Sequence, residues 1–163
     1  DIYPALEKGT IDAAEWIGPY DDEKLGFNKV ARNYYFPGWW EGTLQVSAYI
    51  NADAYNKLPK HYQAALSQAS AAATNDMIAK YDAENPAALR RLISQGAQLK
   101  AFPKPVLDAC YAEANKLYAE MSAASPEFKK IYDSMVAFRD NELPWFRVAE
   151  GSYDSYMGTT IKR

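Results

Sequence analysis

Residues 9–22 read Gly-Thr-Ile-Asp-Ala-Ala-Glu-Trp-Ile-Gly-Pro-Tyr-Asp-Asp, which sets acids and an aromatic ring between turn-forming residues. The β-branched pair Thr10-Ile11 favours a short extended piece. Gly18-Pro19 ends that piece, and a proline suits the first position of a helix. The pattern places Glu15 and Trp16 at the carboxyl end of a strand, where open α/β sheets gather their ligands. We therefore interpret this stretch as a binding site.

A second aromatic stretch, residues 34–42, reads Tyr-Tyr-Phe-Pro-Gly-Trp-Trp-Glu-Gly. It places Glu41 directly behind two tryptophans. Ligand sites are mostly apolar walls with a few placed polar groups, so Trp16, Trp39 and Trp40 indicate a pocket. Core or interface packing is the alternative for these rings, and a plain surface acid is the alternative for Glu15.

Two acids among aromatic rings suit one particular chemistry. Hard cations such as Na⁺ or Ca²⁺ prefer carboxylate and carbonyl oxygens as ligands. A cation in such a pocket would neutralise the acids and a ligand carboxylate together, so that no buried charge is left unpaired. The sequence therefore favours a cation-assisted site for an organic anion.

The composition excludes several classes of protein. With 18 basic and 21 acidic residues among 163, neither sign of charge dominates, which argues against binding to nucleic acid. No run approaches the roughly 18 apolar residues that cross a bilayer. Cys110 is the single cysteine, cannot form an internal disulfide and is expected to be a small buried residue. The length allows one domain or half of a two-domain protein.

Helical patterns dominate the rest of the chain, so the fold class is α/β or α+β with a large helix content. Thr43–Ile50 alternates apolar and polar residues and is the strongest predicted strand. Pro59–Gln95 is the longest predicted helix, with a kink or short break at Pro86. Further helices are expected at 2–8, at 21–32, from the Asn51 cap to Lys57, after Pro103, and from the Ser125 cap to a break at 143–145; short strands are expected at 33–36 and 98–102.

Enzyme motifs are scarce. The lone histidine, His61, lies in the first turn of the long helix, where solvent exposure is expected. Asp12 and Glu15 are three residues apart, which puts them on opposite faces of an extended segment and weakens an acid–base pair. A carboxylate-dependent hydrolase using Glu15 and Glu41 stays as one alternative. A helical interaction module without a small-molecule site is the other.

Three segments, residues 6–20, 34–41 and 51–59, resemble the C-terminal half of a DctP-type solute receptor. Such receptors serve tripartite ATP-independent periplasmic (TRAP) transporters. The branch of the family that this chain most resembles binds 2-oxo acids and related monocarboxylates. The resemblance implies the helix-rich half of a two-lobed periplasmic-binding-protein fold of type II-like architecture. It also implies that the long kinked helix, 59–95, spans both lobes.

The resemblance further implies a site and a cellular setting. In that branch a metal ion, Na⁺ or Ca²⁺, bridges to the ligand carboxylate. Carried over by motif, its ligands are Glu15 through the side chain, Trp16 through the backbone oxygen, and Glu41. Glu15, Trp16 and Trp40 are the expected ligand-binding residues. The protein would then be a periplasmic receptor and not an enzyme, with a small organic acid and TRAP membrane permease subunits as partners.

This chain departs from the family in length. The arginine that clamps the ligand carboxylate and a glutamine near the metal belong to an N-terminal half that would precede Asp1. Since bidentate recognition of a carboxylate needs a held guanidinium, we expect residues 1–163 to form one wall of the cleft and to bind ligand weakly alone. Some members of the branch dimerise by exchanging C-terminal helices, so 125–157 is a candidate homodimer interface; packing within one chain is the alternative. The particular acid and the choice between Na⁺ and Ca²⁺ stay open.

Overall fold

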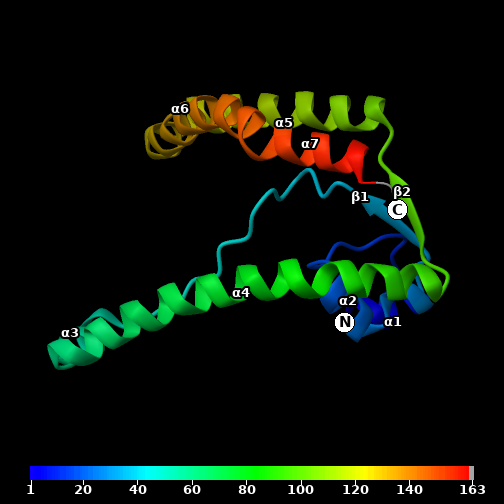
Figure 1. The fold of residues 1–163 in the computed structure, drawn as a ribbon. Helices are drawn as coiled ribbons and strands as arrows, with labels where there is room; N and C mark the ends of the chain where they lie inside the picture. The colour runs from blue at the N-terminus through cyan, green and yellow to red at the C-terminus, as the bar shows by residue number, and fades with distance from the viewer. Residues whose placement is uncertain (162–163) are drawn as a thin grey trace. The chain divides into compact units, whose positions relative to one another are not determined.

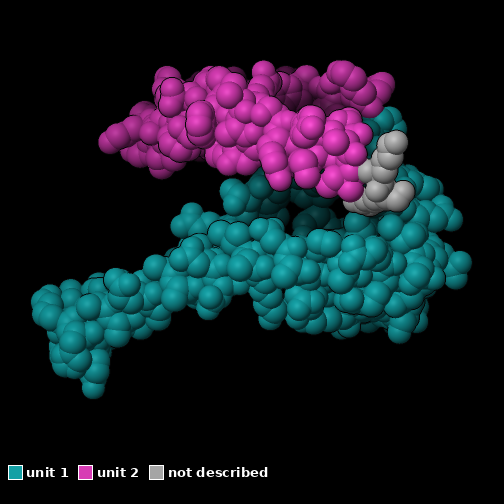
Figure 2. Space-filling view, viewed as in Figure 1, with its two compact units in different colours: residues 1–103 teal, residues 104–163 magenta. Residues whose placement is uncertain are grey.

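The structure, a computed structural model, describes residues 1–161 and is about 70% helical with a small sheet (Figure 1). The last two residues lie outside this description. The chain divides into two compact units, residues 1–103 and the residues from 104 onward (Figure 2). The predicted binding residues all belong to the first unit.

The first unit joins a two-stranded parallel sheet to a long helix and several short ones. Strand β1 pairs with β2 in a register that runs from Asn33 opposite Gln98 to Phe36 opposite Ala101. The strand predictions for these two segments are confirmed. The elements in order are α1 (Ile2–Glu7), α2 (Pro19–Leu25), the 3₁₀ turn η1 (Phe27–Lys29), β1 (Asn33–Phe36), α3 (Ala52–Lys57), α4 (Lys60–Ser94) and β2 (Gln98–Ala101).

Helix α4 is the predicted long helix, 35 residues from Lys60 to Ser94 and thus about 52 Å in length. Pro59 stands at its N-cap. Pro86 lies inside the helix, which continues without a break. A proline removes only one amide donor from the ladder, and water satisfies the freed carbonyl on an exposed face. Of the predicted kink or short break, the break is absent, because the remaining hydrogen bonds hold both halves together; the kink at Pro86 stays a prediction.

A small apolar core lies where the last turns of α4 meet α2. Only Ala88, Leu92 and Ala97 are buried apolar residues among those described, with Leu92 the largest at 2% exposure. The earlier turns of α4, together with α3, extend away from α1 and α2 (Figure 1). The α2 end of α4 is consequently its anchored end.

Two strand predictions are wrong in the described chain. Thr43–Ile50 has no regular secondary structure and is exposed along its whole length. The residues alternate as predicted, but a strand also needs a neighbour to pair its amides and carbonyls, and no described segment forms a sheet with this one. The same holds for Thr10–Trp16, which is irregular, so Glu15 and Trp16 do not follow a strand here.

The predicted helix from Asp21 to Arg32 is shorter than expected. Helix α2 ends at Leu25 because Gly26 adopts a left-handed conformation with φ of 71°. The 3₁₀ turn η1 follows it and leads to β1. The predicted helix continued through Gly26, although a glycine is a typical signal for the C-terminal end of a helix.

The second unit contains α5 (Lys104–Ala124), α6 (Pro126–Val148) and α7 (Glu150–Thr160). The predicted Ser125 cap is confirmed, since its Oγ accepts from the Phe128 amide at 3.2 Å. Helix α6 runs through Pro144, where a break was predicted, and ends at the non-helical residue Ala149. The segment 126–160 is bent by 34°. Cys110, on α5, is half-buried and not fully buried as expected.

Candidate functional site

Glu15 and Trp16 lie on the irregular segment between α1 and α2, and both side chains are exposed. Trp16 is 44% exposed and lines a shallow hollow beside Leu25 and Phe27, with the first residues of α1 opposite. A helical module without a site would bury this acid and this indole in ordinary core contacts. The described chain does not, so both groups are accessible to a ligand.

The second aromatic stretch begins within β1, and its two tryptophans pack together beyond the end of that strand. Trp40 is 46% exposed and meets Trp39 edge-on at 5.5 Å and Phe102 edge-on at 6.0 Å between ring centroids. The same Phe102 ring also stacks on Tyr35, with 5.0 Å between the ring centroids. Sequence reasoning missed Phe102, whose only signal was its position at the end of β2. The cluster fixes the tryptophan pair that directly precedes Glu41.

Glu15 and Glu41 are free carboxylates: neither side chain forms an ion pair within residues 1–161. Together with the Trp16 carbonyl they offer two carboxylates and one carbonyl, the oxygen donors that hard cations require. The described residues contain no group of three or more His, Cys, Asp or Glu that could hold a metal. The donor set therefore fits Na⁺ or Ca²⁺ in type but is incomplete, because these ions take about six to eight oxygens.

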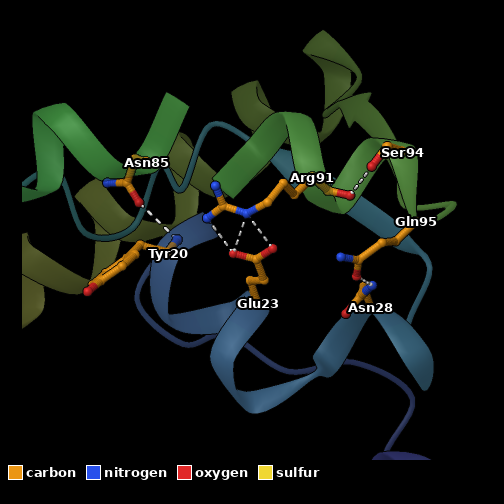
Figure 3. A network of polar contacts seen from close by, with 7 residues as sticks. All are labelled: Tyr20, Glu23, Asn28, Asn85, Arg91, Ser94 and Gln95. Carbon is orange, nitrogen blue, oxygen red and sulfur yellow. Dashed lines mark hydrogen bonds and ion pairs between the residues drawn. The ribbon is translucent and has the colours of Figure 1, made fainter. Parts of the chain in front are cut away.

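Helix α2 begins directly after the Glu15 segment and is capped by another helix. Its N-cap residue, Gly18, has no side chain to accept a hydrogen bond. Asn85 of α4 replaces that group, because its Oδ1 accepts from the Tyr20 amide at 3.0 Å (Figure 3). The orphan amide at the start of α2 is thereby satisfied by a residue 65 positions away.

Two further polar contacts dock α2 and η1 on α4 (Figure 3). The Arg91 guanidinium forms a bidentate pair with Glu23, with Nε 2.8 Å from Oε1 and the terminal nitrogen 2.7 Å from Oε2. This hydrogen bond lowers the pKa of Glu23. The Asn28 amide donates to Gln95 Oε1 at 2.9 Å. Bidentate and amide pairs fix orientation as well as distance, so α2 and η1, which follow the segment carrying Glu15 and Trp16, are attached to the long helix.

Replacing Asn85 by alanine is expected to destabilise the chain by about 1 kcal/mol, since it removes the cap of α2. Urea unfolding measures this loss. A Gly18→Ser exchange should restore part of it, because the Gly18 backbone is extended at φ of 167° and a Cβ there makes only ordinary contact, 3.7 Å from Asn85. A double variant no more stable than the single Asn85→Ala variant would contradict the capping role.

Asp22, on α2, is the one carboxylate that is buried among the described residues, at 7% exposure. Its Oδ2 accepts from the Tyr34 hydroxyl of β1 at 2.5 Å, and its Oδ1 has no hydrogen-bond partner in the described chain. Burial raises the pKa of Asp22, against the opposing effects of the Tyr34 hydrogen bond and the nearby backbone amides. Burial also raises the pKa of Tyr34. Sequence reasoning missed this pair, because nothing in a charged helical turn marks which acid points inward.

The chain belongs to the bacterial extracellular solute-binding proteins of family 7, the DctP family, whose pattern matches residues 1–125. No described helix has the length and apolar character that would let it cross a membrane. The family membership confirms the resemblance on which the fold and the predicted site depend. The fold agrees with it as well, since the structure matches solved TRAP solute-binding proteins.

Among its relatives is the monocarboxylate 2-oxoacid-binding periplasmic protein of Nostoc sp., 41% identical over 98% of this chain and 44% of that protein. A solved TRAP solute-binding protein from Bordetella bronchiseptica RB50 is 54% identical, with a TM-score of 0.94, over 98% of this chain and 47% of that one. It is a dimer with calcium and picolinate in one site and an apo second site. A third relative is the TRAP periplasmic solute-binding protein of Pseudoalteromonas atlantica T6c, solved with bound sodium and pyruvate. It is 32% identical, with a TM-score of 0.83, over 99% of this chain and 48% of that one. The chain thus spans less than half of each relative.

Proposed function

We propose that this chain is the ligand-binding C-terminal half of a periplasmic TRAP receptor for a 2-oxo acid or a related monocarboxylate. The observation that supports this most is the shared chemistry of two solved relatives, each holding a monocarboxylate together with a hard cation. The present chain offers accessible carboxylates of the kind that such a cation needs, at the positions of the family motif. A binding role, not an enzymatic one, follows.

The metal ligands in this proposal are the Glu15 carboxylate, the Trp16 carbonyl and the Glu41 carboxylate. A bound Na⁺ or Ca²⁺ would supply positive charge that offsets both acids and the carboxylate of the solute. The rings of Trp16 and Trp40 form the apolar wall beside it, each about half exposed. The remaining oxygens come from the solute, from water and from the rest of the receptor.

The rest of the receptor is also expected to cover much of the apolar surface seen here. Large apolar side chains stay exposed along the chain, including Val46 at 72% and Tyr62 at 55%. Exposed apolar surface on this scale marks a surface that another body covers. We propose that α4, which is anchored on α2 only at its end, spans both lobes of the receptor. We also propose that TRAP permease subunits take up the solute from the closed receptor.

Withdrawal of the metal tests the proposed function. In the full-length receptor, titration of pyruvate and picolinate in chelator-treated, sodium-free buffer should give an affinity about tenfold or more below that in Ca²⁺ or Na⁺. Isothermal calorimetry with each ion in turn measures the effect and separates the two cations. Equal affinity in choline buffer with and without metal would contradict a metal-bridged site.

The C-terminal helices, 125–157, are the proposed homodimer interface. Ile131, Met135 and Phe138 recur at helical spacing on α6, are 71%, 52% and 68% exposed, and line a shallow hollow. A second copy is the favoured occupant because the Bordetella relative is a dimer.

A Phe138→Asp variant of the full-length receptor should sediment as a monomer at concentrations where the parent is a dimer, because a charge in an apolar interface is left unpaired. Tyr111→Asp is the matched control, since Tyr111 is 64% exposed on α5, in the same unit, and lies outside the proposed interface. Analytical ultracentrifugation distinguishes the two masses. A Phe138→Asp dimer as tight as the parent would place the interface elsewhere.

A further inference from the structure

Phe102 lies directly after β2, and its backbone is fixed there. Its amide donates to the Phe36 carbonyl at 2.8 Å, which extends the pairing of β1 with β2 by one residue beyond Ala101. Pro103 follows it, and the residue before a proline is restricted to extended conformations. The Phe102 side chain therefore leaves the sheet from a backbone that can move little.

The Phe102 ring joins two segments of the first unit. It stacks on Tyr35 of β1, with 5.0 Å between the centroids and 30° between the ring planes. It also meets Trp40 edge-on, at 6.0 Å and 80°. Offset-stacked and edge-on arrangements are the ones that aromatic rings favour. Phe102 is half-buried, while Trp40 is 46% exposed. The contact thus holds part of the Trp40 ring and leaves much of it accessible.

Trp40 has little else to fix its position. The segment that carries it, residues 37–50, contains no helix or strand. The two backbone hydrogen bonds that this segment makes in the described chain both join residues within it. Trp39 meets Trp40 edge-on but belongs to the same segment. Among the aromatic contacts of the described residues, the one with Phe102 is therefore the contact that ties Trp40 to the sheet.

We propose that Phe102 is a positioning residue that sets the orientation of the Trp40 ring, and with it the apolar wall against which the organic part of the solute packs. The inference rests on the proposed function, in which Trp40 forms that wall. Phe102 itself touches neither the metal nor the solute. A ring that is already oriented loses no further freedom when the solute binds, so solute affinity depends on the Phe102 contact.

The test measures the pyruvate affinity of the full-length receptor at saturating Ca²⁺ by isothermal calorimetry. Phe102→Leu keeps an apolar side chain but removes the ring, and it should weaken pyruvate binding about fivefold, the effect of losing one ordered aromatic pair. Phe102→Tyr keeps the ring and should bind as the parent does. Phe128→Leu is the matched control and should change nothing, because Phe128 is also half-buried and stacks on a tyrosine, Tyr132, in the second unit.

A double-mutant cycle shows whether Phe102 acts through Trp40. Trp40→Leu removes the wall itself and should weaken pyruvate binding about tenfold. In that background Phe102→Leu should cost less than about twofold more, since no indole is left to orient. Urea unfolding of each variant shows that it is folded. If Phe102→Leu does not fold, Tyr35→Leu replaces it in the cycle with the same expected pattern, because it removes the ring on which Phe102 stacks.

Four results would overturn the inference alone: parental affinity in a folded Phe102→Leu variant, an equal loss in Phe102→Tyr, an equal loss in Phe128→Leu, or the same fivefold loss in the Trp40→Leu background. In each case the proposed function stands as long as Glu15→Gln still weakens pyruvate binding. Parental affinity in Trp40→Leu would remove Trp40 from the proposed site, and the inference with it. Parental affinity in Glu15→Gln would overturn the proposed metal-bridged function itself.

Discussion

Glutamine in place of Glu15 is expected to lower the affinity of the full-length receptor for both Ca²⁺ and pyruvate about 100-fold. The amide keeps the size of the side chain but removes the negative charge that holds the cation. The solute loses affinity as well, because its carboxylate then faces a weakened positive centre. Calorimetric titrations of each ligand in the presence of the other measure the two losses.

The control for this experiment is Glu7→Gln. Glu7 is an exposed acid of α1 in the same unit. Its substitution makes the same chemical change outside the proposed site. It should leave both affinities at their parental values. Parental binding in Glu15→Gln would show that the cation, if bound, is held by other residues.

Alanine in place of Leu92 is expected to destabilise the chain by about 3 kcal/mol, the largest effect on stability in the first unit. Leu92 is the only large side chain among the described residues that is fully buried, at 2% exposure between α4 and α2. Its removal deletes apolar contacts and leaves a cavity that the surrounding helices fill only in part. Urea unfolding with a fixed m-value measures the change.

The neighbouring residue provides the control for the core. Ile93 is 45% exposed, so Ile93→Ala removes a similar number of carbon atoms from a largely solvated position. We expect a loss of less than about 1 kcal/mol. Equal losses for the two variants would mean that the junction of α4 and α2 is not the core of the first unit.

The helices were largely predictable because their signals are local. Asn51 caps α3, with its side chain accepting from the Ala54 amide, and Ser125 caps α6 in the same way. The exceptions arose where a local signal was overruled. Pro144 stays inside α6, since only one hydrogen bond is lost there, whereas Gly26 ends α2 earlier than the apolar pattern suggested.

The strands were less predictable because a strand is completed by its neighbour. Gln98–Ala101 forms one because Asn33–Phe36 lies beside it in parallel register. Thr43–Ile50 has the stronger alternating pattern but no partner among the described segments. A pattern shows which faces a strand would have, and not whether another strand is present to pair with it.

The candidate site likewise contains residues that the sequence could predict and residues that it could not. The proposed donor residues, Glu15 and Glu41, were predicted from the family resemblance, and both are exposed in the described chain. The residues that hold their segment in place were not predictable. Asn85 and Tyr20 are 65 positions apart, and Asp22 and Tyr34 come from different elements, so only the folded chain brings each pair together.

The cap that Asn85 supplies to α2 also bears on how homologous sequences diverge. Because Gly18 has no side chain, two distant positions share one task. A lineage that acquires serine or aspartate at position 18 frees position 85 to vary, while a lineage that keeps the glycine must keep an acceptor at 85. These two sites are therefore expected to covary across the family, and their substitutions should appear on the same branches of its phylogeny.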